Sequence, residues 1–161
     1  MPKRARCPYC DRSFDRRELD NHIAKCRSSR HVRKVIHPAV RKSVIVDGNN
    51  IAYHLLHNGT PRAENIANAY RSLVSVGFSP TIVISAALKH NIDKPELLAT
   101  IPDIQEAPRG SNDDLLIIQE AQKRNADIIS NDRFLNWLGN YPWLSSRLRR
   151  YRLTPSGLIL S

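Results

Sequence analysis

The sequence predicts an α/β protein, with a parallel β-sheet flanked by helices over residues 43–161 and a small metal-binding module before it. Short β-branched runs, which have the composition of buried strands, alternate with segments whose apolar residues recur at helical spacing. All three cysteines lie within the first 26 residues, beside a histidine at metal-ligand spacing. A basic stretch without sustained periodicity, residues 29–42, separates the two parts and is predicted to be a linker.

The amino-terminal module, residues 1–28, has the ligand spacing of a structural zinc site. Cys7 and Cys10 form a Cys-x-x-Cys pair, and His22 and Cys26 form a His-x-x-x-Cys pair. Four soft or borderline ligands of this kind make the tetrahedron that Zn²⁺ prefers. A module of this length cannot fold on apolar burial alone. The free energy of metal binding, on the order of 10 kcal/mol or more, is therefore expected to supply its stability.

A helix is expected to carry the second half of this zinc site. Both ligands and two apolar residues fall at positions i, i+3, i+4 and i+7 of one helical face: Leu19, His22, Ile23 and Cys26. The module, with its Cys-Pro-Tyr-Cys-Asp-Arg-Ser-Phe opening, resembles the Cys-Cys-His-Cys class of zinc fingers. We expect it to bind nucleic acid, with a protein contact as the alternative.

The charge is concentrated at the amino-terminal end. Residues 1–42 hold 13 Lys and Arg against 4 Asp and Glu, a net charge of +9, out of +10 for the whole chain. Residues 43–161 hold 12 against 11, a net charge of +1. A basic block joined to a near-neutral body indicates a polyanionic partner, most often nucleic acid; ribosomal association or solubility alone is the alternative.

Hydropathy and cysteine usage limit the class of protein. No apolar run approaches transmembrane length, and no apolar core follows the basic amino terminus, so neither a membrane span nor a signal peptide is expected. Cysteines grouped at metal-ligand spacing indicate a reducing compartment rather than a disulfide framework. We therefore expect an intracellular, cytoplasmic protein, or a nuclear one in a eukaryote. The sequence is compatible with a homo-oligomer as well as a monomer.

The strands of the main domain are predicted from β-branched composition. Short runs rich in Val and Ile, bounded by acids, Gly or Pro, are typical of buried parallel strands. Such runs cover residues 43–46, 81–85 and 126–132, with a weaker one at 104–107. The tail predicts a further pair of strands, 147–153 and 158–160, joined by a Thr-Pro-Ser-Gly turn.

Helices are predicted between these strands. Residues 51–57 look helical, and Pro61 opens a second helix that Gly77 closes. Pro95 begins a short helix, and a longer one is expected over about 112–125.

Acidic residues stand where a parallel sheet would bring them together. Asp47 and Asp132 each follow a strand. Asp113 and Asp114 open a helix. The carboxyl ends of strands and the amino ends of the following helices share one edge of a βα sheet, so one crevice is expected to hold all four carboxylates. Mg²⁺ or Mn²⁺ would relieve their mutual repulsion and could activate water for phosphodiester hydrolysis.

Each acid also has a simpler explanation as a helix cap. Asp47 could cap the helix that follows it, and Asp132 could cap one that begins near Arg133. Ser111 and Asp114 match a capping box. Asp114 also shares a helical face with apolar residues, however, so we expect it to point inward rather than to serve only as a cap.

Three motifs carry a family resemblance: Val46-Asp47-Gly48-Asn49-Asn50-Ile51-Ala52, Asp113-Asp114, and Ile128-Ile129-Ser130-Asn131-Asp132. In order, approximate spacing and context, residues 43–153 resemble the PIN-like ribonucleases of the NYN group, particularly the regnase type. The resemblance implies a PIN-like fold and a metal-dependent endoribonuclease acting on single-stranded or loop RNA. It implies that the four aspartates hold the metal ion, that Asn50 assists at the substrate or metal, and that Asn131 lies at the substrate.

One position departs from the regnase pattern. Asn136 stands where that type has another acid, four residues after the last motif aspartate, which leaves enough carboxylates for one metal ion. This departure favours the main alternative, an RNA-binding or adaptor protein that does not cleave. A nuclease acting on structured DNA or on a transfer RNA is the second alternative.

Four arginines give the main domain a basic strip. On an extended strand, Arg150 and Arg152 would share one face, and Arg147 and Arg149 the other. We predict that one pair touches the backbone of the substrate and that the other pair is solvated.

Overall fold

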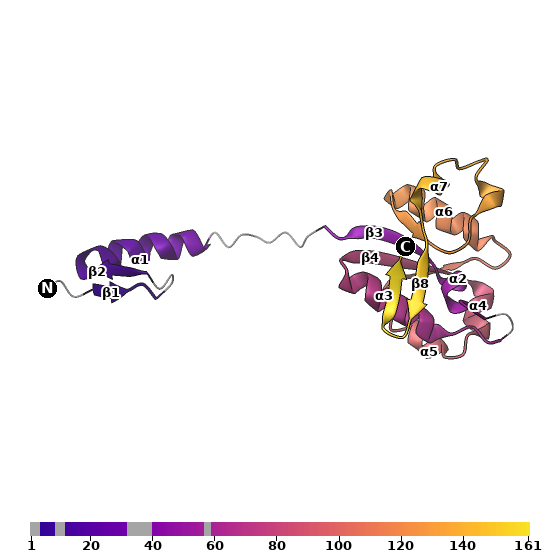
Figure 1. Ribbon diagram of the computed structural model, residues 1–161, viewed down its shortest axis with the longest axis horizontal. Coiled ribbons are helices and arrows are strands. Elements are labelled where there is room, and N and C mark those ends of the chain that lie inside the picture. The colour runs from indigo at the N-terminus through magenta and orange to yellow at the C-terminus, as the bar shows by residue number, and fades with distance from the viewer. Residues whose placement is uncertain (1–3, 9–11, 32–39, 57–58) are drawn as a thin grey trace. The chain divides into compact units, whose positions relative to one another are not determined.

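The computed structural model describes residues 4–8, 12–31, 40–56 and 59–161. The chain divides into two compact units, Met1–Val40 and Arg41–Ser161, which are described separately (Figure 1).

The first unit is a β-hairpin followed by a helix. Strand β1 (Arg4–Arg6) pairs antiparallel with β2 (Ser13–Asp15), and α1 (Arg16–His31) follows directly. The predicted helix that carries His22 and Cys26 is present, and it continues three residues past position 28, into the segment predicted as linker. Cys10 lies outside the described residues.

A five-stranded parallel sheet forms the centre of the second unit. Its strands follow the spatial order β5-β4-β3-β6-β7, and each pair of neighbours is parallel. The strands are β3 (Lys42–Asp47), β4 (Phe78–Ser85), β5 (Ile104–Ala107), β6 (Asp127–Ile129) and β7 (Leu148–Arg149). The chain reverses its direction of travel across the sheet at β3, so β3 and β6 flank the topological switch point, where open α/β sheets bind ligands.

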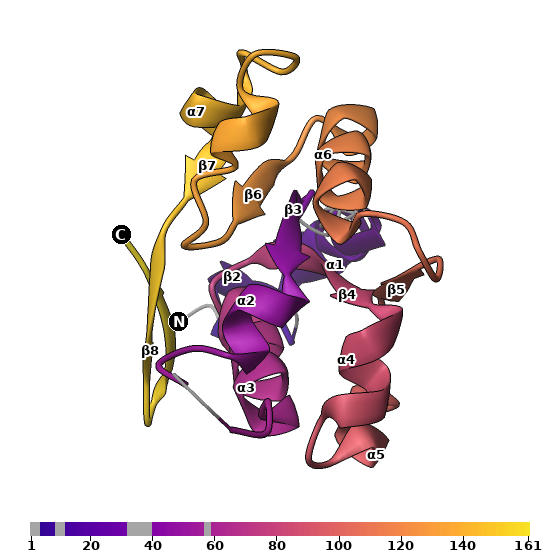
Figure 2. The same cartoon turned by 90° about the vertical axis from the view of Figure 1, so that its right-hand side faces the viewer.

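Helices cover both faces of the sheet, which confirms the predicted fold class. Val44 and Val46 of β3 face one apolar core, and Ile45 faces the other, as the two-residue period of a strand requires. The first core includes residues of α2, α3, α4 and α5, and the second includes residues of α6 and α7; Figure 2 shows α2 and α3 well apart from α6. The helices are α2 (Gly48–Ala52), α3 (Ala63–Ser75), α4 (Ala86–Asn91), α5 (Pro95–Leu98), α6 (Asp113–Arg124) and α7 (Leu144–Arg147), with a 3₁₀ helix, η1 (Leu135–Trp137).

The tail forms an antiparallel pair, β8 (Tyr151–Thr154) and β9 (Gly157–Leu160), that packs on α3. The Leu158 amide donates to Ser72 Oγ of α3 at 3.0 Å. At Gly157, whose φ is +135°, an added Cβ would collide with the Ser72 side chain, so a glycine is required for this close approach.

Several predicted elements differ in extent from the observed ones. Over positions 51–56 of the helix predicted for 51–57, the structure has the end of α2 at Ala52 and then a turn with Leu55 at φ +58°; position 57 lies outside the described residues. The strand predicted over 126–132 is shortened to β6. Ser130 follows it directly; its amide still donates to the Arg149 carbonyl of β7, and its side chain binds Asp47. The single strand predicted from Arg147 to Leu153 is wrong: Arg147 ends α7, and β7 and β8 are separate strands.

Candidate active site

Asp47 ends β3 at the switch point, and both of its carboxylate oxygens are hydrogen-bonded. Its side chain is 5% exposed. Oδ1 accepts from the Asn50 amide at 3.0 Å and thereby caps α2, and Oδ2 accepts from Ser130 Oγ at 2.8 Å. The capping role that the sequence offered as an alternative is therefore real, and it coexists with a position at the carboxyl edge of the sheet.

Gly48 explains why α2 can begin directly against the sheet. A Cβ at this position would lie 2.6 Å from Ile84 Cγ2 and 2.7 Å from the Val83 carbonyl oxygen, both on β4. Any larger residue would push the turn away from β4 and move the Asp47 carboxylate with it. The glycine thus fixes the position of the acid.

Ser130 connects Asp47 to Asp132. Its hydroxyl, which is fully buried, donates to Asp47 and accepts from the Asp132 amide at 3.0 Å. Asp132 is exposed, and its Oδ1 accepts from the Phe134 amide at 2.7 Å. Both acids therefore lie at the same edge of the sheet, one on each side of a single hydroxyl. The sequence reasoning did not assign Ser130 a role, although the Ser-Asn-Asp motif placed it beside the acid.

Asp113 and Asp114 form the first turn of α6, and both are half-buried. The cap of this helix is Asn112, whose Oδ1 accepts from the Asp114 amide at 2.9 Å. The predicted capping box is wrong, because Ser111 Oγ donates instead to the Pro108 carbonyl. The inward face predicted for Asp114 is present, since the apolar residues that share it, Ile117, Ile118 and Ala121, are buried.

The four carboxylates act on one another electrostatically. Burial raises the pKa of Asp47 to about 6, and repulsion from Asp114 and Asp113 adds to this, while the hydrogen bonds from Asn50 and Ser130 oppose it. Burial also raises the pKa of Asp114, followed by repulsion from Asp113 and Asp132, against a lowering hydrogen bond from Trp137. The edge of the sheet thus holds negative charge that no described cation neutralises.

The carboxylate oxygens of the four aspartates lie farther from one another than the ligand atoms of the cysteines and histidine in the first unit. Within the described ranges, Cys7, His22 and Cys26 are the only group of three or more acidic, cysteine or histidine residues whose ligand atoms all lie within 4.8 Å of one another. Mg²⁺ is compatible with the wider spacing of the aspartates, because it keeps several waters and binds proteins through one or two carboxylates. The all-oxygen donor set and the unneutralised charge fit such an ion.

Hydrogen bonds of two asparagines hold the backbone next to the acids in place. Asn50 Oδ1 accepts from the Asn131 amide at 3.0 Å and from the Tyr151 hydroxyl at 2.7 Å. The Asn131 side chain binds the backbone of Tyr151 twice, with Oδ1 accepting from its amide and Nδ2 donating to its carbonyl, each at 3.1 Å. Asn131 therefore joins the β6 loop to β8. Asn50 Nδ2 has no partner in the part of the chain that the structure describes, so it can donate to a ligand.

Comparison with known proteins identifies the second unit. The sequence profile of the Zc3h12a-like ribonuclease NYN domain matches residues 40–156, which is most of the chain. The chain belongs to this family. The main unit is therefore a ribonuclease domain of the NYN type, and the predicted resemblance and PIN-like fold are confirmed.

Two solved structures share the fold of this NYN protein. The crystal structure of nuclear proteinaceous RNase P 2 from A. thaliana matches with a TM-score of 0.61 and 18% identity, over 99% of this chain and 42% of the other. A second structure, Arabidopsis thaliana nuclear protein-only RNase P 2, matches with a TM-score of 0.60 and 17% identity, over 100% of this chain and 42% of the other. The chain thus spans less than half the length of these proteins. No curated protein matches it.

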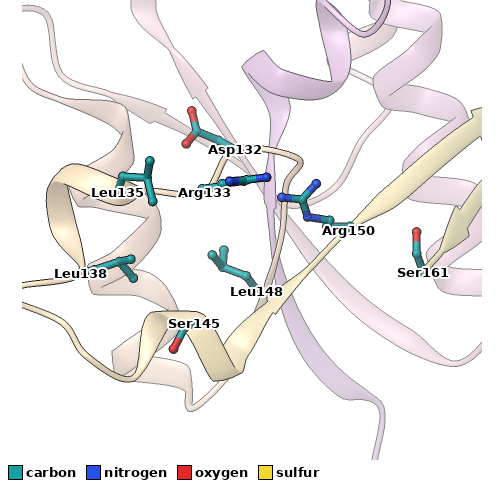
Figure 3. A pocket seen from close by; sticks show the side chains of 8 residues that line it. All are labelled: Asp132, Arg133, Leu135, Leu138, Ser145, Leu148, Arg150 and Ser161. Atoms are coloured by element: carbon teal, nitrogen blue, oxygen red, sulfur yellow. The ribbon is translucent and has the colours of Figure 1, made fainter.

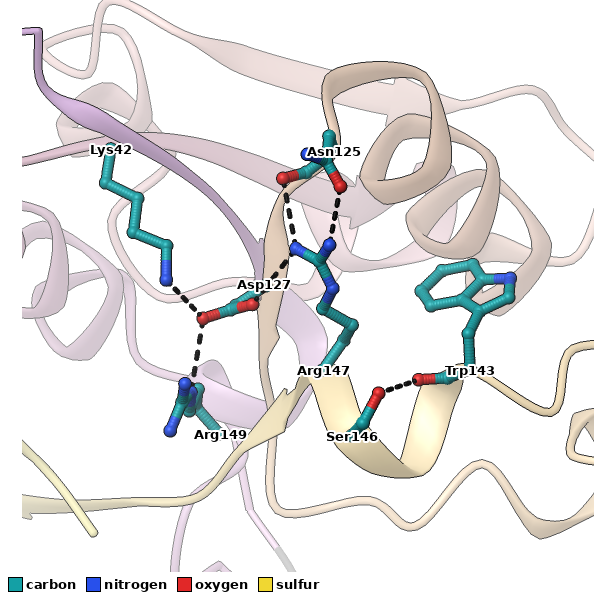
Figure 4. A network of polar contacts seen from close by, with 7 residues as sticks. All are labelled: Lys42, Asn125, Asp127, Trp143, Ser146, Arg147 and Arg149. Carbon is teal, nitrogen blue, oxygen red and sulfur yellow. Dashed lines mark hydrogen bonds and ion pairs between the residues drawn. The ribbon is translucent and has the colours of Figure 1, made fainter.

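Two of the four predicted substrate arginines of the NYN domain bind an internal acid (Figure 4). Asp127, 4% exposed at the start of β6, accepts from Lys42 Nζ at 2.8 Å and from Arg149 Nε at 3.2 Å, with Arg147 Nη1 at 3.5 Å. Arg147 also binds the carbonyl and the side chain of Asn125, at 3.1 and 2.5 Å. Burial tends to raise the pKa of Asp127, but the hydrogen bonds and charges of Lys42 and Arg149 outweigh it, and the pKa is lowered.

Arg150 and Arg152 have different surroundings. Arg150 lies between β7 and β8 and lines a pocket that also includes Asp132 (Figure 3). Arg152 is exposed on β8. Contact of any of the four arginines with a substrate stays a prediction.

Three of the four predicted zinc ligands lie together in the first unit of the NYN protein. Cys7 is buried, and the Phe14 ring stacks on the His22 ring with centroids 3.8 Å apart. Together with Cys26, these ligands make a site whose sulfur and nitrogen donors suit Zn²⁺. In the part of the chain that the structure describes, no helix has the length and apolar character needed to cross a membrane.

Proposed function

We propose that the NYN domain is a divalent-metal-dependent endoribonuclease that hydrolyses phosphodiester bonds in single-stranded or loop RNA. The observation that carries the proposal is the set of four aspartates at the switch point of the sheet, two of which have raised pKa values because their charges are buried and unneutralised. Membership of a ribonuclease family supports the choice of RNA as substrate. Structured DNA or transfer RNA is the alternative substrate.

Asp47, Asp114 and Asp132 would hold Mg²⁺ or Mn²⁺, with Asp113 adding negative charge beside them. The ion would supply an activated water and neutralise charge on the scissile phosphate. Asp47 is kept in position by Ser130 and by the Asn50 amide, so its carboxylate needs no rearrangement when substrate arrives. Asn50 Nδ2 is the nearby amide group that can donate to a phosphate oxygen.

The first unit is proposed to be a structural zinc finger that strengthens RNA binding. Cys7, His22 and Cys26 supply three ligands, and Cys10 is proposed as the fourth. Its basic surroundings would add phosphate contacts to those of the NYN domain, and such contacts make affinity dependent on salt.

A cleavage assay tests the nuclease proposal. Labelled single-stranded RNA and DNA are incubated with the purified chain and Mg²⁺ or Mn²⁺, with and without chelator. Asp47→Asn and Asp114→Asn should abolish cleavage, while RNA binding persists or tightens because repulsion of the phosphates falls. Asp93→Asn is the matched control, because the Asp93 side chain accepts a hydrogen bond from the Ala63 amide and asparagine can do the same.

The outcomes separate the proposals. Cleavage that survives in both site variants would identify a contaminating nuclease and refute the assignment. RNA binding without cleavage under either metal would support the non-cleaving adaptor instead, for which Asn136 is the sequence feature. Cleavage of DNA in preference to RNA would assign the alternative substrate.

A further inference from the structure

A pocket of about 510 Å³ opens beside the acids, on the side of η1 and β7. Its lining combines cationic and apolar side chains, with one acid at its border to the proposed metal site. The residues that matter for its chemistry are Asp132, Arg133, Leu135, Leu138, Leu148 and Arg150. Asp132 is thus shared between this pocket and the proposed metal site.

The two arginines of the pocket differ from Arg147 and Arg149 in their partners. In the described part of the chain, neither the Arg133 nor the Arg150 guanidinium has a hydrogen-bond or ion-pair partner, whereas Arg147 and Arg149 bind Asp127. Figure 3 shows the side chains of Arg133 and Arg150 pointing toward each other. Two facing guanidinium groups repel, and an anion between them would relieve the repulsion. Arginine is well suited to that role because its planar fork binds phosphate through two parallel hydrogen bonds.

The apolar part of the pocket suits a nucleobase. Leu135 is 65% exposed, so its side chain is accessible to a ligand, and Leu138 and Leu148 also line the pocket. A nucleotide has both features in one unit, a flat base with an apolar face and an anionic phosphate. Between the two guanidinium groups a metal ion would be repelled, and an uncharged ligand would leave both positive charges without a counter-charge.

We propose that this pocket holds a nucleotide of the RNA strand next to the scissile phosphate, with Arg133 and Arg150 binding its phosphate and the leucines contacting its base. The proposal rests on the proposed nuclease function, because the shared Asp132 is what places the nucleotide beside the cleavage site. It names Arg133, which the sequence reasoning did not select, as a substrate-positioning residue.

Fluorescence anisotropy with a labelled single-stranded RNA tests the pocket independently of cleavage. The full-length chain is titrated without added Mg²⁺ at several salt concentrations, and gels verify that the RNA stays intact. Arg133→Ala and Arg150→Ala should each weaken binding about fivefold and reduce the slope of log K against log salt by about 0.7, the value for one phosphate contact with a single strand. Leu135→Ala should weaken binding without changing the slope, because it removes an apolar contact only.

Arg71→Ala is the matched control, since Arg71 is exposed on α3 and its side chain binds Asn68 of the same helix. Circular dichroism verifies that each variant is folded. If an alanine variant of Arg133 or Arg150 is unfolded, the corresponding glutamine variant, Arg133→Gln or Arg150→Gln, is used in its place. If the pocket variants bind RNA like the Arg71→Ala control, with the same slope of log K against log salt, the nucleotide-binding proposal is wrong, whether or not the wild type cleaves. If the pocket variants bind RNA more weakly but the wild type does not cleave, the pocket is an RNA-binding site and the nuclease proposal is rejected.

Discussion

Replacing Asp47 by asparagine is expected to stabilise the NYN domain at neutral pH in buffer without added Mg²⁺. Burial and neighbouring acids raise the pKa of this carboxyl from 3.8 to about 6. Each pKa unit corresponds to about 1.4 kcal/mol, so keeping the side chain ionised costs the folded state up to about 3 kcal/mol. Asparagine removes the charge and still offers Oδ1 to the Asn50 amide, so a gain of about 1–3 kcal/mol in the free energy of unfolding is expected.

The free energy of unfolding should depend on pH in a direction set by the raised pKa of Asp47. Between about pH 4 and pH 6 the folded state binds the Asp47 proton more tightly than the unfolded state does, so the wild type loses stability as the pH rises through this range. Above about pH 7, one unit beyond the folded-state pKa, this contribution is constant. Asp47→Asn lacks the group and should not show this loss.

Urea denaturation followed by circular dichroism, repeated from pH 4 to pH 8, measures both quantities. Asp93→Asn is the control, because it changes an exposed acid that caps Ala63. A destabilised Asp47→Asn variant, or one whose pH profile equals that of the wild type, would contradict the account of a buried charge at the switch point. Adding Mg²⁺ should stabilise the wild type more than the variant, because ion binding and ligand charge are linked.

Other predictions concern the parts that support the site. Ser130→Ala should lower the free energy of unfolding by about 1.5–3 kcal/mol at pH 7, because Asp47 loses a hydrogen bond in a buried position; denaturant titration measures it. Asp127→Ala should cost about 1–2 kcal/mol, since Lys42, Arg147 and Arg149 lose their shared counter-charge but stay partly solvated; an unchanged unfolding midpoint would refute the network. Deleting residues 1–30 should weaken RNA binding and flatten its salt dependence in anisotropy titrations, and an equal salt slope would remove the first unit from RNA recognition.

The predicted helix and strand boundaries failed where short-range patterns are weak. The helices α4 and α7 have six and four residues, too few to show a helical period, and neither was predicted. The run after Gly48 looked helical through position 57, but α2 ends at Ala52, and the left-handed backbone of Leu55 lies in the turn that follows. Around Arg147, alternation in the sequence suggested a strand, whereas its side chain is held by Asn125 and Asp127 at the end of α7.

The sequence by itself determined the parallel sheet and the edge at which the acids stand. Strands with β-branched runs and acids directly after them carry this information locally, because a parallel sheet places every strand end of one kind on one side. Only the tertiary structure decided which polar side chains bind one another within the protein and which stay available to a ligand. Residues far apart in the chain meet across the sheet, so Ser130 binds Asp47 and Arg149 binds Asp127, while Arg150 remains available beside Asp132. Spacing along the chain does not carry these partnerships, because they depend on strand order and register.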